Sequence, residues 1–309
     1  MILVLGNPVY DYIETKKIKT DGRILSGCST NAALALSRLG RELTLVGSVG
    51  EDFSESFLAD MKGYGIEARA LPSIESGGFS LVYYDDFGNR NLDLLGRAEP
   101  ITAIDDDLLT KAEAVLIGPI LREISFDLIR DIRRRFDGLF FCDPQGLLRN
   151  AGKDGRIYHE KPEGIEEILG LFDIVKPNEL EGRVLTGIDC RRDPFEAARI
   201  IKSWGPKLVI VTLAELGSII YDGRNFYEIP PYEIDLVDST GAGDTYMAGF
   251  THARLNGEDL RGCGTFASCV SSVMIEQVGP DFVLTEEQVR DRQESLLGKI
   301  DFKVQLCQT

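Results

Sequence analysis

A glycine-rich turn between two aspartates precedes an apolar run in the last third of the chain. The turn is Asp238-Ser239-Thr240-Gly241-Ala242-Gly243-Asp244, and the run after it is Thr245-Tyr246-Met247-Ala248-Gly249-Phe250. Two glycines around an alanine let the backbone approach an oxyanion closely. The amides of Gly241, Ala242 and Gly243 would point at that anion from the N-terminus of a helix. The pattern therefore predicts an anion hole for a phosphate.

Asp244 closes this turn and brings a negative charge to the place where a bound phosphate would lie. The placement is useful if the carboxylate takes a proton from a hydroxyl group that then attacks the phosphorus. The alternative is an ordinary helix N-cap, because Asp and Gly are favoured at helix starts in any case. A P-loop and a dinucleotide-binding fingerprint are both excluded by the sequence around the glycines.

Short apolar runs alternate with amphipathic segments through most of the chain. We expect strands at 2–5, 43–49, 114–118, 139–142, 174–175, 207–212 and 226–229. We expect helices at 30–39, 54–61, 126–136, 194–204, 243–255, 260–276 and 285–297. This alternation predicts an α/β fold with a mostly parallel central sheet and helices on both faces. Ligands of such sheets bind at the carboxyl ends of the strands.

Two segments, 11–24 and 77–95, alternate like strands but have no helix between the strands. Turn residues interrupt them at 20–22 and 85–89. We expect two hairpins that pair into a small β lid, from about 11–25 and 77–97, within a single domain that spans 1–309. An exposed lid sheet allows pairing with the lid of a second copy, so a homodimer through the lid is one expectation.

The composition excludes several classes of partner. The 34 basic and 50 acidic residues give 34 − 50 = −16, so the chain repels nucleic acids and anionic membranes. Apolar runs are too short to span a membrane, and the N-terminal run resembles a buried strand more than a signal peptide, which predicts a cytoplasmic protein. Six scattered cysteines and 2 histidines favour reduced, buried thiols over disulfides or a zinc site.

Five segments of this sequence also stand in the order of one family's motifs. They are Ser26-Gly27-Cys28-Ser29-Thr30-Asn31, Gly47-Ser48-Val49-Gly50-Glu51-Asp52, Asn178-Glu179-Leu180-Glu181, Val211-Thr212-Leu213-Ala214-Glu215-Leu216-Gly217 and the turn that ends at Asp244. They resemble the G-G-x-x-x-N, G-x-V-G-x-D, N-x-x-E, V-T-L-G-x-x-G and D-T-x-G-A-G-D motifs of the ribokinase (PfkB) carbohydrate kinases.

The resemblance implies a ribokinase-like fold and an enzyme that transfers the γ-phosphoryl group of ATP, with Mg²⁺, to a hydroxyl of a sugar or sugar-like molecule. It makes Asp244 the catalytic base and Gly241, Ala242 and Gly243 the anion hole. On the donor side it places the residues of two further motifs, Asn178, Thr212 and Gly217. Glu181 would bind magnesium in its outer coordination shell, through water molecules. The alternative for Asn178 and Glu181 is a helix capping box, and both roles can hold together.

For the acceptor, the resemblance points to Asp11, Gly27, Asn31 and Glu123. A carboxylate accepts two hydroxyl hydrogen bonds, as neighbouring hydroxyls of a sugar require. The alternative for both acids is an exposed loop charge. Gln145 and Arg149, which follow the strand expected at 139–142, are further candidates.

Three residues depart from the family's pattern: Ser26 and Ala214 replace glycines, and Ser239 replaces threonine. The leading hypothesis is an ATP-dependent kinase of a neutral sugar, polyol, cyclitol or nucleoside. A sugar-phosphate kinase is an alternative if arginines converge, with Arg90, Arg97 and Arg122 as candidates. A catalytically silent binding protein is another, although binding alone would not require the carboxylate of Asp244.

Overall fold

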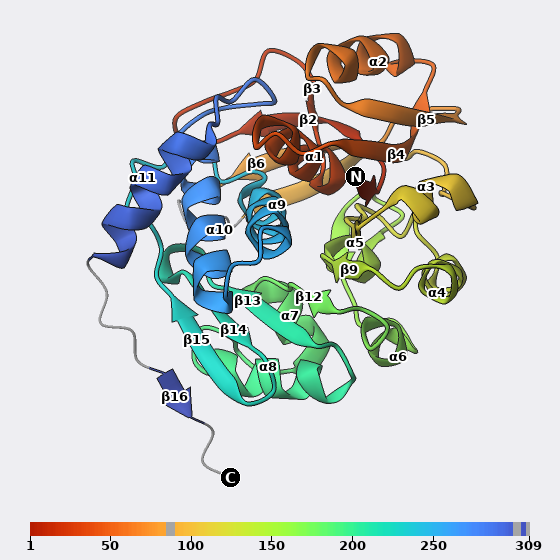
Figure 1. The fold of residues 1–309 in the computed structure, drawn as a ribbon. Coiled ribbons are helices and arrows are strands. Elements are labelled where there is room, and N and C mark those ends of the chain that lie inside the picture. Colours follow the sequence, from red (N-terminus) through yellow and green to blue (C-terminus); the bar gives the residue numbers. More distant parts are fainter. Residues whose placement is uncertain (85–89, 299–303, 307–309) are drawn as a thin grey trace.

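The computed structural model describes residues 1–84, 90–298 and 304–306 of the chain (Figure 1). The turn expected at 85–89, the side chain of Arg90 and Cys307 lie outside this part. Among the described residues, ten strands form one sheet in the order β16-β15-β14-β13-β12-β9-β8-β1-β4-β5. These strands are β1 Ile2–Leu5, β4 Leu43–Gly50, β5 Glu67–Ser73, β8 Ala114–Ile117, β9 Leu139–Cys142, β12 Ile174–Val175, β13 Leu208–Thr212, β14 Ser218–Tyr221, β15 Asn225–Ile229 and β16 Val304–Leu306.

The sheet is parallel from β5 to β13 and antiparallel from β13 to β16. Its central strands are buried on both sides, because successive side chains point to opposite faces. In β1, Ile2 and Val4 join one hydrophobic core, whereas Leu3 and Leu5 join the other. A continuous apolar run is therefore the pattern that a strand in this place requires.

Helices cover both faces of the sheet (Figure 1). The first core receives side chains from α1 Cys28–Arg38, α2 Ser54–Gly63, α9 Ala242–Leu255, α10 Leu260–Met274 and α11 Glu286–Leu297. The second core receives them from α3 Asp106–Lys111, α4 Phe126–Arg135, α5 Gln145–Leu148, α6 Ile165–Leu169, α7 Glu179–Thr186 and α8 Pro194–Ser203. The predicted α/β fold is confirmed, and the expected strands and helices end within two residues of the observed ones.

A separate sheet of four strands, which we call the lid sheet, contains the two segments that broke the alternation. Its order is β3-β2-β6-β7, with β2 Val9–Glu14, β3 Ile24–Ser26, β6 Gly78–Tyr83 and β7 Arg90–Gly96. Each segment forms an antiparallel pair, and the two pairs join through parallel β2 and β6. A short hairpin that the sequence pattern did not predict, β10 Arg149–Ala151 and β11 Ile157–His159, bridges to this sheet from Arg156 to Asp93.

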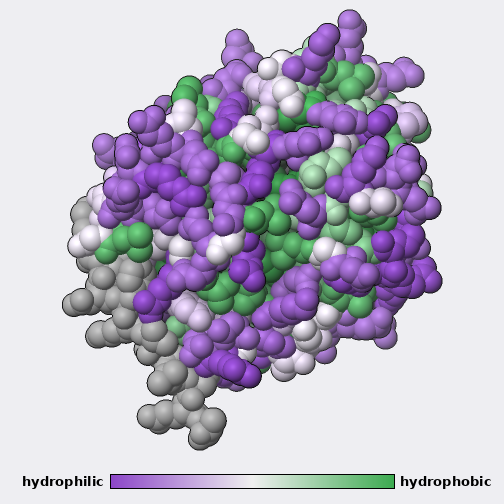
Figure 2. Space-filling view, viewed as in Figure 1, coloured by the Kyte–Doolittle hydropathy of each residue, from purple (hydrophilic) through white to green (hydrophobic). Residues whose placement is uncertain are grey.

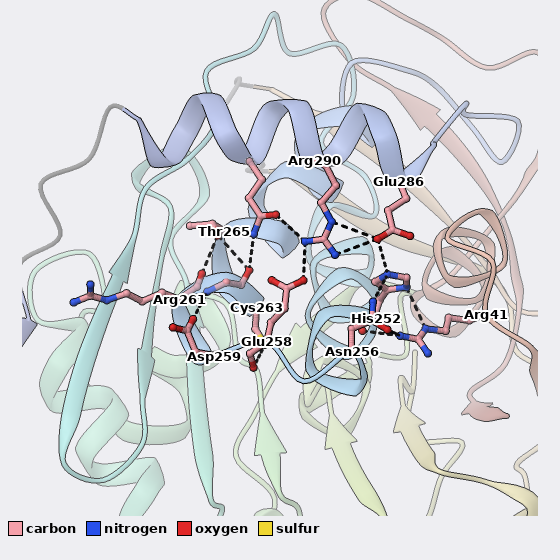
Figure 3. Close-up of polar contacts among 12 residues, drawn as sticks. Arg41, His252, Asn256, Glu258, Asp259, Arg261, Cys263, Thr265, Glu286 and Arg290 are labelled. Atoms are coloured by element: carbon pink, nitrogen blue, oxygen red, sulfur yellow. Dashed lines mark hydrogen bonds and ion pairs between the residues drawn. The ribbon is translucent and has the colours of Figure 1, made fainter.

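A polar network fastens α11 to the rest of the molecule (Figure 3). Arg41 donates to Nδ1 of the buried His252 at 3.2 Å, and Glu286 of α11 lies 3.6 Å from Nε2 of the same ring. Arg290 of α11 pairs with Glu258 at 2.6 Å. Burial and the neighbouring Arg41 cation hold the pKa of His252 below its usual value. The network explains how a helix with a mostly polar sequence is held in place.

The surface that Figure 2 shows is mostly polar. Figure 2 shows hydrophilic residues over most of the viewed face, with hydrophobic residues grouped near its centre. None of the described helices is long and apolar enough to cross a lipid bilayer. The five cysteines in the described part of the chain are buried and carry no disulfide: Cys28, Cys142, Cys190, Cys263 and Cys269.

Candidate active site

The glycine-rich turn forms the N-terminus of α9, the helix that the sequence predicted there. Gly241 is the N-cap residue, with φ of 81° in the left-handed region that favours glycine. Asp244 stands in the first turn of the helix. The amide of Ala242 donates to the carbonyl oxygen of Ser239 at 3.3 Å, which closes the turn. A helix of 14 residues thus directs its positive end toward this loop.

Side chains from two other elements reach the carboxylate of Asp244. Asn31 of α1 donates from Nδ2 to Oδ2 at 2.9 Å. Gln145, at the start of α5, donates from Nε2 to Oδ1 at the longer distance of 3.5 Å. The guanidinium of Arg149 in turn donates to Oε1 of Gln145 at 2.6 Å. The structure therefore brings together four residues that the sequence analysis singled out separately.

A buried thiol and a buried ion pair also lie close to Asp244. The Sγ of Cys28 and carboxylate oxygens of Asp143 and Asp244 all lie within 4.8 Å of one another. Lys176 pairs with Asp143 at 2.7 Å, and the two side chains are only 2% and 4% exposed. Burial and the nearby Asp143 carboxylate raise the pKa of Asp244, while the hydrogen bond from Asn31 lowers it. Burial lowers the pKa of Lys176, but the carboxylates of Asp143 and Glu181 outweigh this effect and raise it, so the ammonium stays charged.

The N-x-x-E segment forms the capping box of α7. Glu181 accepts from the backbone amide of Asn178 at 2.8 Å and from its side-chain amide at 2.7 Å. Its own amide donates to Oδ1 of Asn178 at 2.9 Å. Burial, together with the Asp143 carboxylate, raises the pKa of Glu181 to about 7. The capping alternative is therefore present in the structure, around a buried carboxyl group that still faces the charged cluster.

The end of β13 and the segment after it supply the other expected donor-side residues. Thr212 pairs with Asn178 through a parallel β-bridge, which places these two residues side by side. Gly217 has φ of 86°, and a Cβ there would lie 2.1 Å from the carbonyl oxygen of Ile229. Only glycine fits at that close approach. Ala214 adopts φ of 50° in the short 3₁₀ helix Ala214–Leu216, so the replaced glycine still has a left-handed backbone.

The proposed acceptor acids are buried, so the alternative of exposed loop charges is wrong for both. Asp11, 4% exposed, accepts from the backbone amide of Phe79 across the lid sheet at 2.8 Å. Glu123, also 4% exposed, accepts from backbone amides of Asn7, Ile120 and Leu121 at 2.8–3.0 Å. A carboxylate held by three amides fixes the shape of the loop around it.

Glu123 and Phe79 line the same small cavity, of about 20 Å³. That volume holds roughly one water molecule. The structure thus groups Glu123 with the base of the lid sheet, whereas Asn31, Gln145 and Arg149 gather around Asp244. Gly27, with φ of 115°, stands directly before α1 and accepts the amide of Asn31 at 2.8 Å.

Sequence reasoning missed three residues beside Asp244, namely Cys28, Asp143 and Lys176. A signal existed for two of them, since Asp143 follows the strand at 139–142 and Lys176 precedes the N-x-x-E segment. Arg122 is one of the arginines expected to bind a second phosphate or to neutralise the adjacent Glu123. In the structure its guanidinium pairs with Glu160 at 2.7 Å, while the neighbouring Glu123 turns to backbone amides.

Residues 2–287 match the sequence profile of the pfkB family of carbohydrate kinases. The chain belongs to this family. This kinase is 30% identical over 297 residues to a nucleoside kinase of Methanothermobacter thermautotrophicus, with 90% of each chain covered. The predicted family and the enzyme class, a kinase, are both confirmed.

Solved structures resemble this kinase over nearly its whole length. A pyrophosphate-dependent kinase in the ribokinase family, in complex with a pyrophosphate analogue and myo-inositol, superposes with a TM-score of 0.81 at 27% identity, over 94% of this chain and 100% of that one. Arabidopsis thaliana ribokinase, in complex with ribose and ATP, has a TM-score of 0.73 at 24% identity, over 95% and 98% of the two chains. The protein is thus a carbohydrate or nucleoside kinase with the ribokinase-like fold.

Proposed function

We propose that this kinase transfers the γ-phosphoryl group of ATP to a hydroxyl of a neutral, polyhydroxylated acceptor: a sugar, a cyclitol such as inositol, or a nucleoside. The observation that carries the proposal is the position of Asp244, in the first turn of α9 directly after Gly241 and Gly243, with one oxygen bound by Asn31. A carboxylate beside an anion hole would repel a phosphate. An acceptor hydroxyl between the two resolves the conflict and gives the carboxylate a proton to remove.

In this proposal Asp244 takes the proton of the acceptor hydroxyl while that oxygen attacks the γ-phosphorus. The bond between the γ-phosphorus and the leaving oxygen of ADP breaks in line with the attack. The amides of Gly241, Ala242 and Gly243 would stabilise the charge that gathers on the transferred group, since they lie at the N-terminus of α9, the positive end of its dipole. The Ala242 amide would exchange its 3.3 Å contact with Ser239 for the anion.

The charges of the site fit a divalent cation near the donor. Three buried or half-buried carboxylates, those of Asp143, Glu181 and Asp244, lie near the ammonium of Lys176. The guanidinium of Arg149 is the further cation nearby, and it is bound to Gln145. Carboxylate oxygen atoms are the ligands that Mg²⁺ prefers in proteins. Glu181 would hold the ion through water, because Asn178 occupies its oxygens. When bound, magnesium neutralises charge on the triphosphate.

The donor side would consist of Asn178, Thr212 and Gly217. Asn178 and Thr212 lie side by side, and Gly217 accepts the amide of Leu213, the residue after β13. The acceptor would lie under the lid sheet, within reach of Asp11 and Asn31 and against the backbone of Gly27. Gln145 belongs on this side too, because it reaches the second oxygen of Asp244. Glu123 would act through the loop that it holds.

The contacts of the arginines favour a neutral acceptor over a phosphorylated one. A second phosphate needs several converging cations. Arg122 is paired with Glu160, and Arg97 is exposed with its backbone amide bound to Glu75. The sugar-phosphate alternative therefore lacks its cluster in the described part of the chain. The alternative of a silent binding protein does not account for Asp244.

Pyrophosphate is a second candidate donor. It is favoured by the close similarity of fold to a pyrophosphate-dependent kinase, at 27% identity over 94% of this chain. The anion hole binds phosphoryl oxygens in either donor, so the chemistry at Asp244 is the same. The cytoplasmic location and the homodimer through the lid stay predictions from the sequence.

The test measures ADP release from Mg·ATP, and phosphate release from magnesium pyrophosphate, with a panel of acceptors. The panel contains myo-inositol, ribose, fructose, cytidine and adenosine, each offered free and phosphorylated. We expect turnover with at least one free acceptor. A clear preference for the phosphorylated members that is lost in Arg97→Ala would contradict the proposal, and so would the absence of turnover with all of them.

A further inference from the structure

Residues from both halves of the lid sheet contact the segment that leads into the anion hole, 236–240. Tyr83, the last residue of β6, places its hydroxyl 2.8 Å from Oγ1 of Thr240. Lys17, in the loop after β2, donates its ammonium to the carbonyl oxygen of Leu236. Tyr83 is buried, whereas Lys17 is exposed, so the Tyr83 contact is the better shielded of the two.

The backbone of this segment is also anchored next to α10. The amides of Val237 and Asp238 both donate to the carbonyl oxygen of Ile275, just after α10, at 3.0 and 3.1 Å. The Thr240 amide donates to Oδ1 of Asp238 at 2.9 Å, a contact internal to the segment. The Thr240 side chain is therefore bound to the lid sheet, one residue before the anion hole begins.

Gly241 connects Thr240 to Asn31, the side chain that binds the proposed base, Asp244. A Cβ built on Gly241 would lie 2.8 Å from Nδ2 of Asn31, so the backbone of the loop lies directly against the side chain that binds Asp244. A shift of Thr240 changes the place of the Gly241 backbone and with it the room available to Asn31. The path from Tyr83 to Asp244 is thus a chain of direct contacts.

We propose that the Tyr83–Thr240 hydrogen bond couples the lid sheet to the anion hole, so that the lid in its present position orders the loop that binds the donor. Thr240 occupies the variable position of the D-T-x-G-A-G-D motif, so the contact depends on a hydroxyl that this motif does not require. Tyr83 is then a positioning residue. The role in catalysis rests on the proposed function; the link between lid and loop does not.

Hydrogen exchange in the ligand-free protein tests the link itself. We expect backbone amides in 236–244 to exchange about fivefold faster in Tyr83→Phe than in the natural protein, the effect of losing one hydrogen bond. Tyr12→Phe is the matched control, because it removes another lid hydroxyl, one that donates to Glu14 at 3.0 Å within the lid sheet. Equal exchange in 236–244 for Tyr83→Phe and the natural protein would overturn the inference.

Thr240→Val supplies a second variant that removes the same contact from the other side. It should speed exchange in the same peptides, and the double variant should add nothing further, because either change already breaks the bond. Effects that add fully in the double variant would show that the two hydroxyls act independently, which overturns the inference. If Tyr83→Phe folds poorly, Thr240→Val alone tests whether the hydrogen bond orders the segment.

Binding of Mg·AMP-PNP, a donor analogue, tests the functional consequence by calorimetry. In Tyr83→Phe the dissociation constant of Mg·AMP-PNP should rise about fivefold, because the loop that binds the donor has lost the contact that orders it. Tyr12→Phe should bind Mg·AMP-PNP as the natural protein does. A role in stability alone would lower the melting temperature of Tyr83→Phe and leave this dissociation constant unchanged, which would overturn the inference. If no acceptor is found, the proposed function fails, and the exchange experiment still decides the link.

Discussion

Asn31 donates a 2.9 Å hydrogen bond to the carboxylate of Asp244, although 213 residues separate the two in the sequence. The contact exists because α1 packs against α9, with Asn31 and Asp244 each in the first turns of its helix. A hydrogen bond to a carboxylate favours its charged form. It opposes burial and the negative charge of Asp143, which both favour the protonated form.

Asn31→Leu should therefore raise the pKa of Asp244. A base must be ionised to accept a proton, so the acidic limb of the pH profile of kcat should move to higher pH. The measurement is kcat between about pH 5 and pH 9 with Mg·ATP and the best acceptor of the panel. Asn225→Leu is the control, because Asn225 also donates to an aspartate, Asp222, at 3.4 Å on β15. An acidic limb that stays in place for Asn31→Leu would argue against Asp244 as the base.

Asp244→Asn should lower kcat by roughly 10²–10⁴-fold, because the amide keeps the shape of the side chain and cannot accept the proton. Binding of Mg·AMP-PNP should change little, since the anion hole consists of backbone amides. Asp259→Asn serves as the control: Asp259 caps α10 and accepts the amide of Gly262 at 2.7 Å. Turnover of Asp244→Asn close to that of the natural protein would refute the assignment.

Glu181→Gln should raise the magnesium concentration that gives half the maximal rate, because the carboxylate is assigned to the outer shell of the ion. A titration of rate against magnesium at saturating ATP measures this. Glu179→Gln is a neighbouring control in the same helix turn, where the carboxylate pairs with Arg191 at 3.0 Å. An unchanged magnesium dependence with lower stability alone would leave Glu181 only its capping role.

The same variant has a pH signature in the ligand-free protein. Burial and Asp143 raise the pKa of Glu181 to about 7, above the ordinary 4.5 of an unfolded chain. The folded state then keeps a proton that the unfolded state loses, so the stabilising effect of this group is present at low pH and is lost as the pH rises through about 7. Gln does not titrate. The melting temperature of Glu181→Gln, relative to the natural protein, should therefore rise between about pH 5 and pH 8.

The sequence predicted those elements whose structure is decided by residues close together in the chain. A continuous apolar run predicted β1, because a strand covered on both faces has no polar side chain to place. The spacing of Asn178 and Glu181 predicted the capping box, since both partners lie within one helix turn. The lid hairpins followed from alternation and turn residues in the same way.

The sequence could not supply contacts that depend on how distant elements stack. Cys28, Asp143 and Lys176 come from α1 and from the ends of β9 and β12, and they meet only because these strands stand near one another in the sheet. The pairing of Arg122 with Glu160 was equally hidden. It depends on Glu123 turning its carboxylate inward to backbone amides, which residue types alone do not reveal.

Lys176→Met should destabilise the protein strongly, because it leaves the carboxylate of Asp143 buried without the ammonium that pairs with it at 2.7 Å. Breaking a buried pair from one side costs about 3–5 kcal/mol of unfolding free energy. Urea denaturation measures the loss. Lys207→Met removes a pair of similar length, 2.6 Å from Asp173, but the Lys207 side chain is 79% exposed, and such pairs contribute about 0–1 kcal/mol.

A second variant separates the pair from the packing around it. Lys176→Met combined with Asp143→Leu removes both charges, so most of the lost stability should return. Activity should not return with it, because the charges around Asp244 and Glu181 have changed. If Lys176→Met costs no more than Lys207→Met, the buried pair does not have the role that its burial implies.

Gly241→Ala tests whether the anion-hole loop must lie directly against Asn31. Two costs are expected, and the chain offers a way to separate them. One is the strain of an alanine at φ of 81°, about 1 kcal/mol of unfolding free energy. The other is the Cβ, which would lie 2.8 Å from Nδ2 of Asn31 and displace that side chain from Asp244.

Gly257→Ala carries the first cost without the second, because Gly257 has φ of 83° and nothing within 4 Å of an added Cβ. Both variants should lose stability in urea denaturation, and Gly241→Ala should lose more, because its added Cβ would also lie 2.8 Å from Cε of Met274. Only Gly241→Ala should lower kcat, and its pH profile should shift in the same direction as that of Asn31→Leu, because both changes remove the hydrogen bond that favours the Asp244 carboxylate. If Gly241→Ala matches Gly257→Ala in activity as well as in stability, Asn31 can move aside without consequence, and the contact between loop and base is not needed for the reaction.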